Sequence, residues 1–287
     1  MKPSGGAWRP VNQQEQKQTT NERQCSMKAK LRYPSPDKVR QMDLAELREL
    51  VLADFDRDIT PDEIRHILEI CDALWLHSGD SLAPHAELTS GMCSDGFADV
   101  LRMLRYSNLC EIMAGQLVRV LRQHYDGKVD WVIGSDHAGA VLSHDVARLL
   151  KAQHDFTEKS EGKKQVWRRF QIKPDEVVLQ VEELITTTGT LQAVREGLRA
   201  GNLTPVNFVP FTLALVHRSD SFDFEGDQIL HLAHYDINKW SPADCPLCKS
   251  GSGRLRPKDH WAELKGGSGT SQQAAHQHHE QQGDDGP

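Results

Sequence analysis

Two adjacent carboxylates, Glu182 and Glu183, stand where a run of apolar residues gives way to a loop rich in hydroxyl groups. The apolar run at 177–181 predicts a buried strand, and residues 191–200 predict a helix beyond the loop. The first backbone amides of a helix lack partners and lie at the positive end of its dipole, so this loop suits a phosphate. The carboxylates can hold ribose hydroxyls or the ligand shell of a magnesium ion. The loop residues are Thr186, Thr187, Thr188, Gly189 and Thr190.

A second loop of small and polar residues has the same setting. It follows an apolar run at 129–133, opens a helix that we predict at 138–150, and includes Ser135, Asp136 and Gly139. Small residues let the backbone approach an anion closely, so we interpret this loop as a second phosphate site. The alternative is an ordinary strand-to-helix turn in which glycine serves only the backbone geometry.

A basic segment at 156–170 lies between that helix and the acidic strand, and it contains Lys159, Lys163 and Lys164. Cations that reach a negatively charged leaving group stabilise the transition state. A loop that closes over the reactants also excludes water. The alternative reading of this segment is a solvated, charged hairpin.

Residues 177–191 resemble the phosphoribosyl-pyrophosphate motif of type I phosphoribosyltransferases, in which a strand runs into two acids, an apolar pair and a Thr/Gly-rich loop. Two positions differ from the usual pattern: both acids are Glu, and Thr188 stands where Gly is frequent. The resemblance implies that Glu182 and Glu183 hold the ribose hydroxyls and take part in catalysis. It implies that the threonine loop binds the 5-phosphate, and that residues 134–139 bind pyrophosphate with Mg²⁺.

Residues 85–99 look like the N-terminal segment of orotate phosphoribosyltransferases, in which Ser-Gly and a later aromatic residue help to form the base pocket. Ser90, Gly91 and Phe97 fit that outline, whereas Met92 replaces the usual lysine. In the same branch a lysine-bearing catalytic loop often reaches into the partner subunit, and Lys159 best matches its first lysine. Arg218 is a further base-binding candidate, with His217 where the family often has Asp.

The resemblance therefore predicts an enzyme that transfers ribose 5-phosphate from phosphoribosyl pyrophosphate to a nitrogenous base, orotate or a related pyrimidine, and releases pyrophosphate. It also implies pyrimidine biosynthesis, a Mg²⁺ cofactor and a homodimer. A regulatory protein of the same fold that binds the donor without catalysis is one alternative, and Met92 and Thr188 would suit it. An unrelated nucleotide-binding α/β protein is another, although neither G-x-x-x-x-G-K-[ST] nor G-x-G-x-x-G occurs.

The elements that must position these residues alternate between strands and helices. We expect helices at 43–55 and 107–125, a strand at 206–216 and an edge strand at 229–237. A capping box at Thr60–Glu63 should open a further helix whose apolar stripe runs to Trp75. Such alternation predicts an α/β fold with a mostly parallel central sheet flanked by helices. The family resemblance further implies a small N-terminal hood. Ligands of such sheets bind at the carboxyl ends of the strands.

Composition sets the remaining expectations for this 287-residue chain. Its hydrophobic content of 38% and charged content of 26% are ordinary for a globular protein, and its net charge of −7 argues weakly against nucleic-acid binding. The sequence has no run of 18 apolar residues, so we expect no transmembrane helix. The cysteines are dispersed along the chain, which favours a location in the cytoplasm. We expect a phosphoribosyltransferase domain at 31–262 between disordered tails at 1–30 and 263–287.

One Cys-x-x-Cys pair, Cys245 and Cys248, is a weak zinc candidate because four ligands are normally needed and no second pair follows. His231, His234 and His260 could complete a site only if the fold brought them near. A redox role would want the pair at a helix N-terminus. A pair of ordinary thiols is the alternative.

Overall fold

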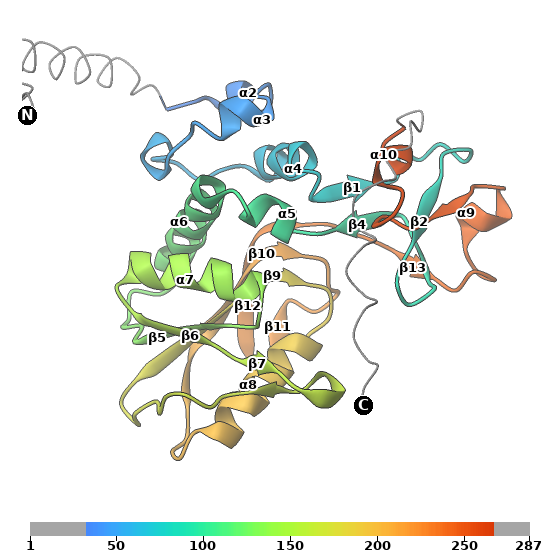
Figure 1. The fold of residues 1–287 in the computed structure, drawn as a ribbon. Helices are drawn as coiled ribbons and strands as arrows, with labels where there is room; N and C mark the ends of the chain where they lie inside the picture. The colour runs from blue at the N-terminus through green and yellow to red at the C-terminus, as the bar shows by residue number, and fades with distance from the viewer. Residues whose placement is uncertain (1–32, 267–287) are drawn as a thin grey trace, which may run out of the picture. The chain divides into compact units, whose positions relative to one another are not determined.

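The computed structural model describes residues 33–266, so the tail expected at 1–30 and most of the tail expected at 263–287 lie outside the described residues. The chain divides into two compact units, each formed by two separate stretches of sequence (Figure 1). Among the described residues, the first unit comprises 33–73 and 99–235 and the second comprises 74–98 and 236–266. The single domain expected at 31–262 thus corresponds to two units that we describe separately.

The first unit is built on a six-stranded sheet in the order β11-β12-β10-β9-β5-β6. Every neighbouring pair is parallel except β11 with β12, which confirms the expected class of a mostly parallel α/β sheet. The expected edge strand at 229–237 is wrong in its position, because β12 lies between β10 and the short β11. The strands are β5 (Trp131–Gly134), β6 (Gln153–Phe156), β9 (Val177–Ile185), β10 (Asn207–His217), β11 (Asp223–Phe224) and β12 (Asp227–His234).

Helices cover both faces of this sheet, with α7 on one face and α8 on the other (Figure 1). The side chains between the sheet and α8 form a core of Trp131, Ile133, Trp167, Ile172, Val178, Val194 and Leu198. The helices of the unit are α2 (Pro36–Val39), α3 (Leu44–Leu47), α4 (Pro61–Ile70), α5 (Leu101–Leu104), α6 (Ser107–His124), α7 (Ala138–Leu150) and α8 (Gly189–Gly201). Those expected at 107–125, 138–150 and 191–200 are confirmed.

Two expectations at the N-terminal end were wrong in extent. The helix expected at 43–55 is broken into α3 and the 3₁₀ turn η1 (Leu52–Asp54), because the Asp54 carboxylate accepts from the Val51 amide and begins a new turn. The capping box at Thr60 does open α4, but the helix ends at Ile70. Trp75, which we placed on its apolar stripe, lies in a strand instead.

The basic segment at 156–170 forms a hairpin, the form named in the alternative reading of this segment. Strand β7 (Glu158–Lys159) pairs antiparallel with β8 (Gln165–Val166), and η2 (Glu161–Lys163) joins them. Two glycines of α8 allow the chain around β8 to lie against the helix. A Cβ at Gly197 would stand 2.5 Å from the Gln165 carbonyl oxygen, and one at Gly201 would stand 2.2 Å from that of Trp167. The hairpin therefore docks on α8 through backbone contact.

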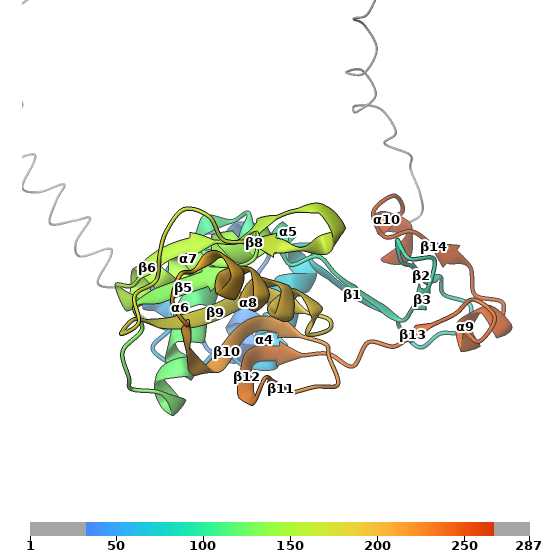
Figure 2. The same ribbon diagram turned by 90° about the horizontal axis from the view of Figure 1, so that it is seen from below.

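The second unit has two small sheets. Strands β1 (Leu74–Leu76) and β4 (Gly96–Ala98) pair antiparallel, and the other four form the order β13-β3-β2-β14 (Figure 2). These four are β2 (His85–Glu87), β3 (Cys93–Ser94), β13 (Lys239–Trp240) and β14 (Arg254–Leu255), and two short helices follow as α9 (Pro246–Lys249) and α10 (Trp261–Leu264). Its core is small, with Trp75, Ala86 and Leu264 buried. Residues 263 and 264, which we assigned to the tail, thus belong to α10.

Candidate active site

The two glutamates lie near the end of β9, where Leu184 and Ile185 complete the strand, and they face the loop that follows β5. The Ser135 hydroxyl donates to Oε2 of Glu182 at 2.6 Å, and the Glu182 residue is only 2% exposed. A Cβ at Gly139 would lie 3.2 Å from Oε2 of Glu182 and 3.4 Å from Oε2 of Glu183. The structure therefore brings together the acid pair and the second loop, which lie over 40 positions apart in the sequence.

The loop after β5 is tightly folded and needs its glycines. A Cβ at Gly134 would stand 2.4 Å from the Gly139 carbonyl oxygen, and one at Gly139 would stand 2.6 Å from the Ser135 hydroxyl. His137, which precedes α7, has a φ of +60°, a left-handed conformation that is unusual for a residue with a side chain. Strained backbone of this kind is found preferentially at ligand sites.

Several carboxyl groups gather at this point. Burial, followed by repulsion from Glu183, raises the pKa of Glu182. Burial, with the charges of Asp136 and Asp99, also raises the pKa of Glu183, against the effect of a backbone hydrogen bond. Oε1 of Glu182 and Oε2 of Glu183 are buried and have no hydrogen-bond partner among the described residues. Such oxygens are ready to bind hydroxyl groups or a hard cation, so the side chains fit Mg²⁺.

The threonine loop connects β9 to the N-terminus of α8. Thr188 is the N-cap residue, yet its side chain makes no capping hydrogen bond. Thr187, Gly189 and Thr190 are exposed, so the N-terminal turn of this 13-residue helix is accessible. Free hydroxyls and uncapped amides at a helix N-terminus form a suitable anion site.

The hairpin reaches the loop after β5 through a residue that sequence reasoning missed. The Gln165 amide donates to Oδ1 of Asp136 at 3.3 Å, and Gln165 pairs with Lys159 across the hairpin. Lys159 itself is exposed. No local motif signals Gln165, because its contact depends on the hairpin register and on the docking against α8.

The base-binding candidates are divided between the two units. In the first unit, Arg218 follows β10, and its backbone amide donates to the Ile185 carbonyl at 2.9 Å, at the start of the threonine loop. In the second unit, Ser90 and Gly91 form the turn between β2 and β3, with Gly91 at a φ of +78°. Phe97 on β4 packs edge-to-face on Trp261 at 6.0 Å between ring centroids.

A histidine cluster at the ends of β10 and β12 was also missed. His217 donates from Nε2 to the Ser221 carbonyl at 3.0 Å, and its Nδ1 lies 2.8 Å from Nδ1 of His234. Because a carbonyl oxygen only accepts, Nδ1 of neutral His217 must accept from His234. His231 stacks on His217 at 5.1 Å. The proposal that His231 or His234 completes a site with the cysteines is wrong, because both belong to this cluster.

Comparison with known proteins agrees with this geometry. The chain is 31% identical over 179 residues to orotate phosphoribosyltransferase of Chlorobaculum parvum, an alignment that covers 62% of this chain and 89% of that protein. It is 31% identical over 196 residues to orotate phosphoribosyltransferase of Thermotoga maritima, which covers 68% of this chain and 96% of that protein. The chain belongs to the orotate phosphoribosyltransferase family.

Membership in the orotate phosphoribosyltransferase family makes the chain a pentosyltransferase with the type I phosphoribosyltransferase fold, as the sequence predicted. No protein-family model matches the chain. Among solved structures, orotate phosphoribosyltransferase from Aeropyrum pernix aligns with a TM-score of 0.44 at 21% identity, over 58% of this chain and 91% of that one.

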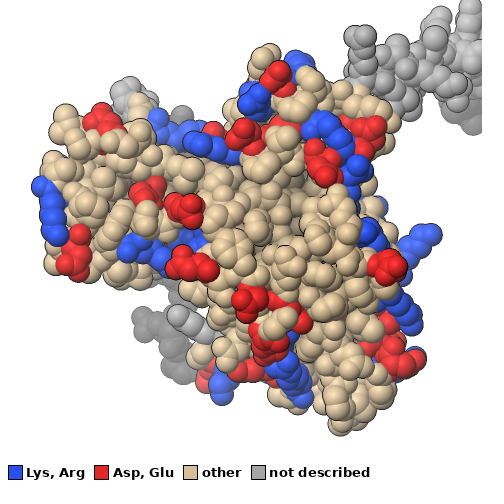
Figure 3. Space-filling view, turned by 180° about the vertical axis from the view of Figure 1, so that it is seen from behind, with Lys and Arg blue, Asp and Glu red and all other residues tan. Residues whose placement is uncertain are grey.

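Two observations concern the expected absence of other partners. In residues 33–266 no helix is long and apolar enough to cross a membrane. Lys and Arg side chains are interspersed with Asp and Glu on the face drawn in Figure 3. That the enzyme does not bind nucleic acid stays a prediction from its net charge of −7.

Proposed function

We propose that the enzyme transfers the 5-phosphoribosyl group from phosphoribosyl pyrophosphate to orotate and releases pyrophosphate, as a step of pyrimidine biosynthesis. The names of the relatives support orotate as the acceptor. The observation that carries the proposal is the pair of carboxylates beside the loop after β5, each with one buried oxygen that has no hydrogen-bond partner among the described residues. A catalytic site explains why the fold keeps this unfavourable concentration of charge.

In this proposal each loop binds one end of the donor. The threonine loop, residues 186–190, holds the 5-phosphate at the N-terminus of α8. Glu182 and Glu183 hold the ribose hydroxyls and favour positive charge on the ring. The loop with Ser135, Asp136 and Gly139 holds the pyrophosphate.

The reaction breaks the bond between ribose C1 and a pyrophosphate oxygen and forms a bond between C1 and a ring nitrogen of the base, and that nitrogen gives up its proton to solvent or to the leaving pyrophosphate. The leaving oxygen keeps the electron pair of the broken bond, and the carboxylates stabilise the oxocarbenium-like ring. Positioning of the base and the sugar supplies much of the remaining rate acceleration. A bound Mg²⁺ would neutralise charge on the pyrophosphate, and Asp136, Glu182 and Glu183 are the side chains that would hold it.

Lys159 is proposed to neutralise the leaving pyrophosphate. Its support is the hairpin, because Gln165, the residue opposite Lys159, contacts Asp136 of the pyrophosphate loop. A homodimer is also part of the proposal. Measurement of the mass in solution tests the dimer. A cytoplasmic location remains a prediction.

Arg218 of the first unit is the proposed base-binding residue supported here, and Ser90, Gly91 and Phe97 of the second unit remain base-binding candidates from the family resemblance. Orotate carries a carboxylate, which a guanidinium group binds in bidentate fashion, and this supports Arg218. Met92 cannot supply the cation that the family usually places after Ser-Gly. We therefore expect the enzyme to depend on Arg218 for its preference for orotate over uracil.

The test is pyrophosphate release by the purified chain with Mg²⁺ and with orotate, uracil or adenine as acceptor. Release with orotate that exceeds release with the other bases supports the proposal. Tight donor binding without release for any base would instead favour a regulatory protein that senses the donor. No measurable donor binding would overturn both.

A further inference from the structure

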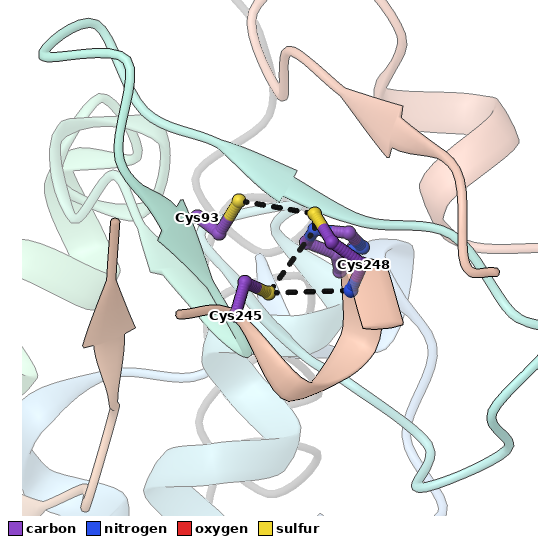
Figure 4. A group of neighbouring side chains, drawn as sticks. Cys93, Cys245 and Cys248 are labelled. Atoms are coloured by element: carbon purple, nitrogen blue, oxygen red, sulfur yellow. Dashed lines mark hydrogen bonds between the residues drawn. The ribbon is translucent and has the colours of Figure 1, made fainter. Parts of the chain in front are cut away.

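Four side chains that could bind a metal converge in the second unit. They are His85 on β2, Cys93 on β3, Cys245 before α9 and Cys248 within it, and their ligand atoms all lie within 4.8 Å of one another. Figure 4 shows the three cysteine side chains pointing toward one another from these separate elements. We propose that these four residues bind one structural zinc ion.

Three of the distances between these ligand atoms are close to the edges of a zinc tetrahedron. Zinc bonds of about 2.3 Å to sulfur and about 2.0 Å to nitrogen place neighbouring ligand atoms about 3.5 to 3.8 Å apart. The sulfur atoms of Cys93 and Cys248 lie 3.6 Å apart. Nε2 of His85 lies 3.6 Å from the Cys245 sulfur and 3.4 Å from the Cys248 sulfur.

The orientation of the histidine is fixed by a second contact. Nδ1 of His85 lies 2.7 Å from the Ser252 hydroxyl, and that hydroxyl donates to the Ala83 carbonyl at 2.6 Å. The hydroxyl therefore accepts from His85, so Nδ1 carries the hydrogen and Nε2 presents its lone pair to the sulfurs. Metal-binding histidines are typically held in this way by an outer hydrogen bond.

The alternatives account for less of this arrangement. Cys93, Cys245 and Cys248 are all free cysteines, so no disulfide joins any two of them. A redox-active Cys245–Cys248 pair gives no reason for His85 and Cys93 to lie beside it. Three cysteines and one histidine fill all four positions, which is typical of a structural site, whereas catalytic zinc keeps one position open.

The site also meets a physical need of the second unit. Its core is limited to a few side chains around Trp75 and Leu264, and small units often depend on a metal for stability. His85 and Cys93 lie on either side of the turn that carries Ser90 and Gly91, and the other two ligands come from the returning C-terminal segment. Zinc would therefore hold that turn to α9.

The experiment measures metal in the full chain, so its outcome does not depend on the transferase activity. We expect one zinc ion per wild-type chain by elemental analysis, lost in Cys245→Ser and in Cys93→Ser. Cys110→Ser is the matched control, because Cys110 is a buried thiol of α6 in the first unit, and it should retain the ion. The histidines at 276, 278 and 279 are present in every variant, so metal bound there cannot produce a difference.

Cobalt replacement keeps the proposal testable if a variant fails to fold. The wild-type chain loaded with Co²⁺ should show the intense visible bands of tetrahedral cobalt and a sulfur-to-cobalt charge-transfer band. Zinc content that is equal in all variants would identify adventitious binding only and overturn the proposal. Octahedral cobalt spectra, or a disulfide between Cys245 and Cys248 in the purified protein, would overturn it as well.

Discussion

The hydroxyl of Ser135 donates to the buried carboxylate of Glu182 at 2.6 Å, which joins the loop after β5 to the end of β9. In a parallel sheet, the carboxyl ends of neighbouring strands meet at one edge, and β5 and β9 are direct neighbours. The bond therefore places the proposed pyrophosphate loop beside the proposed ribose-binding acids. A substitution at Ser135 or at Glu182 should therefore weaken the binding of both the pyrophosphate and the ribose of the donor.

Replacing a proposed catalytic glutamate should stabilise the free protein while it removes activity. Burial raises the pKa values of Glu182 and Glu183, so their ionised forms oppose folding at neutral pH. We expect Glu182→Gln and Glu183→Gln each to raise the melting temperature without divalent metal and to lower kcat about 10²-fold or more. Calorimetry and pyrophosphate release measure the two effects.

Glu176→Gln is the matched control for those variants. Glu176 accepts hydrogen bonds from the Lys173 amide and the Trp131 ring, and these contacts lower its pKa. Its loss should lower the melting temperature and leave kcat largely intact. A Glu183→Gln enzyme with wild-type turnover would refute the catalytic assignment.

Adding one methyl group at Gly139 should weaken donor binding. The new Cβ would stand 2.6 Å from the Ser135 hydroxyl and close to both carboxylates, so the Ser135 side chain or the loop must shift. We expect Gly139→Ala to raise the KM for phosphoribosyl pyrophosphate at least about tenfold, a loss of about 1.4 kcal/mol. Gly253→Ala is the control, because Gly253 has open space around its Cβ position, and unchanged kinetics for Gly139→Ala would contradict the assignment.

Lys159 should contribute to turnover more than to folding. Its side chain is exposed on the hairpin, so Lys159→Ala should change the melting temperature little. If the lysine neutralises the leaving pyrophosphate, kcat should fall about 10²-fold while the KM for orotate changes less. Lys164→Ala, at an exposed position of the same hairpin, serves as the comparison. A larger loss for Lys164→Ala would transfer the role to that residue.

The histidine cluster should make the first unit sensitive to acid. Burial lowers the pKa values of His217 and His231, so the folded state takes up protons at lower pH than the unfolded chain does. Stability from this source is complete above the unfolded pKa of about 6.5 and is lost as pH falls through the folded values. The melting temperature should therefore decline below about pH 6.5, and less steeply in His231→Gln. Equal slopes in both proteins would argue against the cluster as the cause.

Sequence reasoning recovered the elements whose signals are local. The run 177–191 shows its strand, acids, loop and helix within one continuous segment, and the structure has all four, although β9 continues through the acids to Ile185 and α8 begins at Gly189. The same holds for the loop with Ser135 and for the start of α4 at Thr60. In each case, periodicity and turn chemistry are sufficient because neighbours in sequence are neighbours in space.

The parts that sequence reasoning missed depend on contacts between distant segments. Trp75 fits a helical stripe, but pairing with Phe97 across β1 and β4 places it in a strand. Cys93 and His85 carry no local sign that they meet Cys245. That meeting requires the β2–β3 hairpin and the return of the chain through α9.

Helix α8 contacts two functional segments. Its first turn follows the threonine loop, and its glycines at 197 and 201 lie against the chain around β8. This one helix therefore sets the distance between the threonine loop and β8, the strand opposite Lys159. A bulkier residue at position 197, far from any reacting atom, would push β8 away from α8 and so displace Lys159. This would change the turnover rate without changing the catalytic side chains. Variation along this helix is therefore a route by which evolution could adjust turnover while every catalytic side chain stays the same.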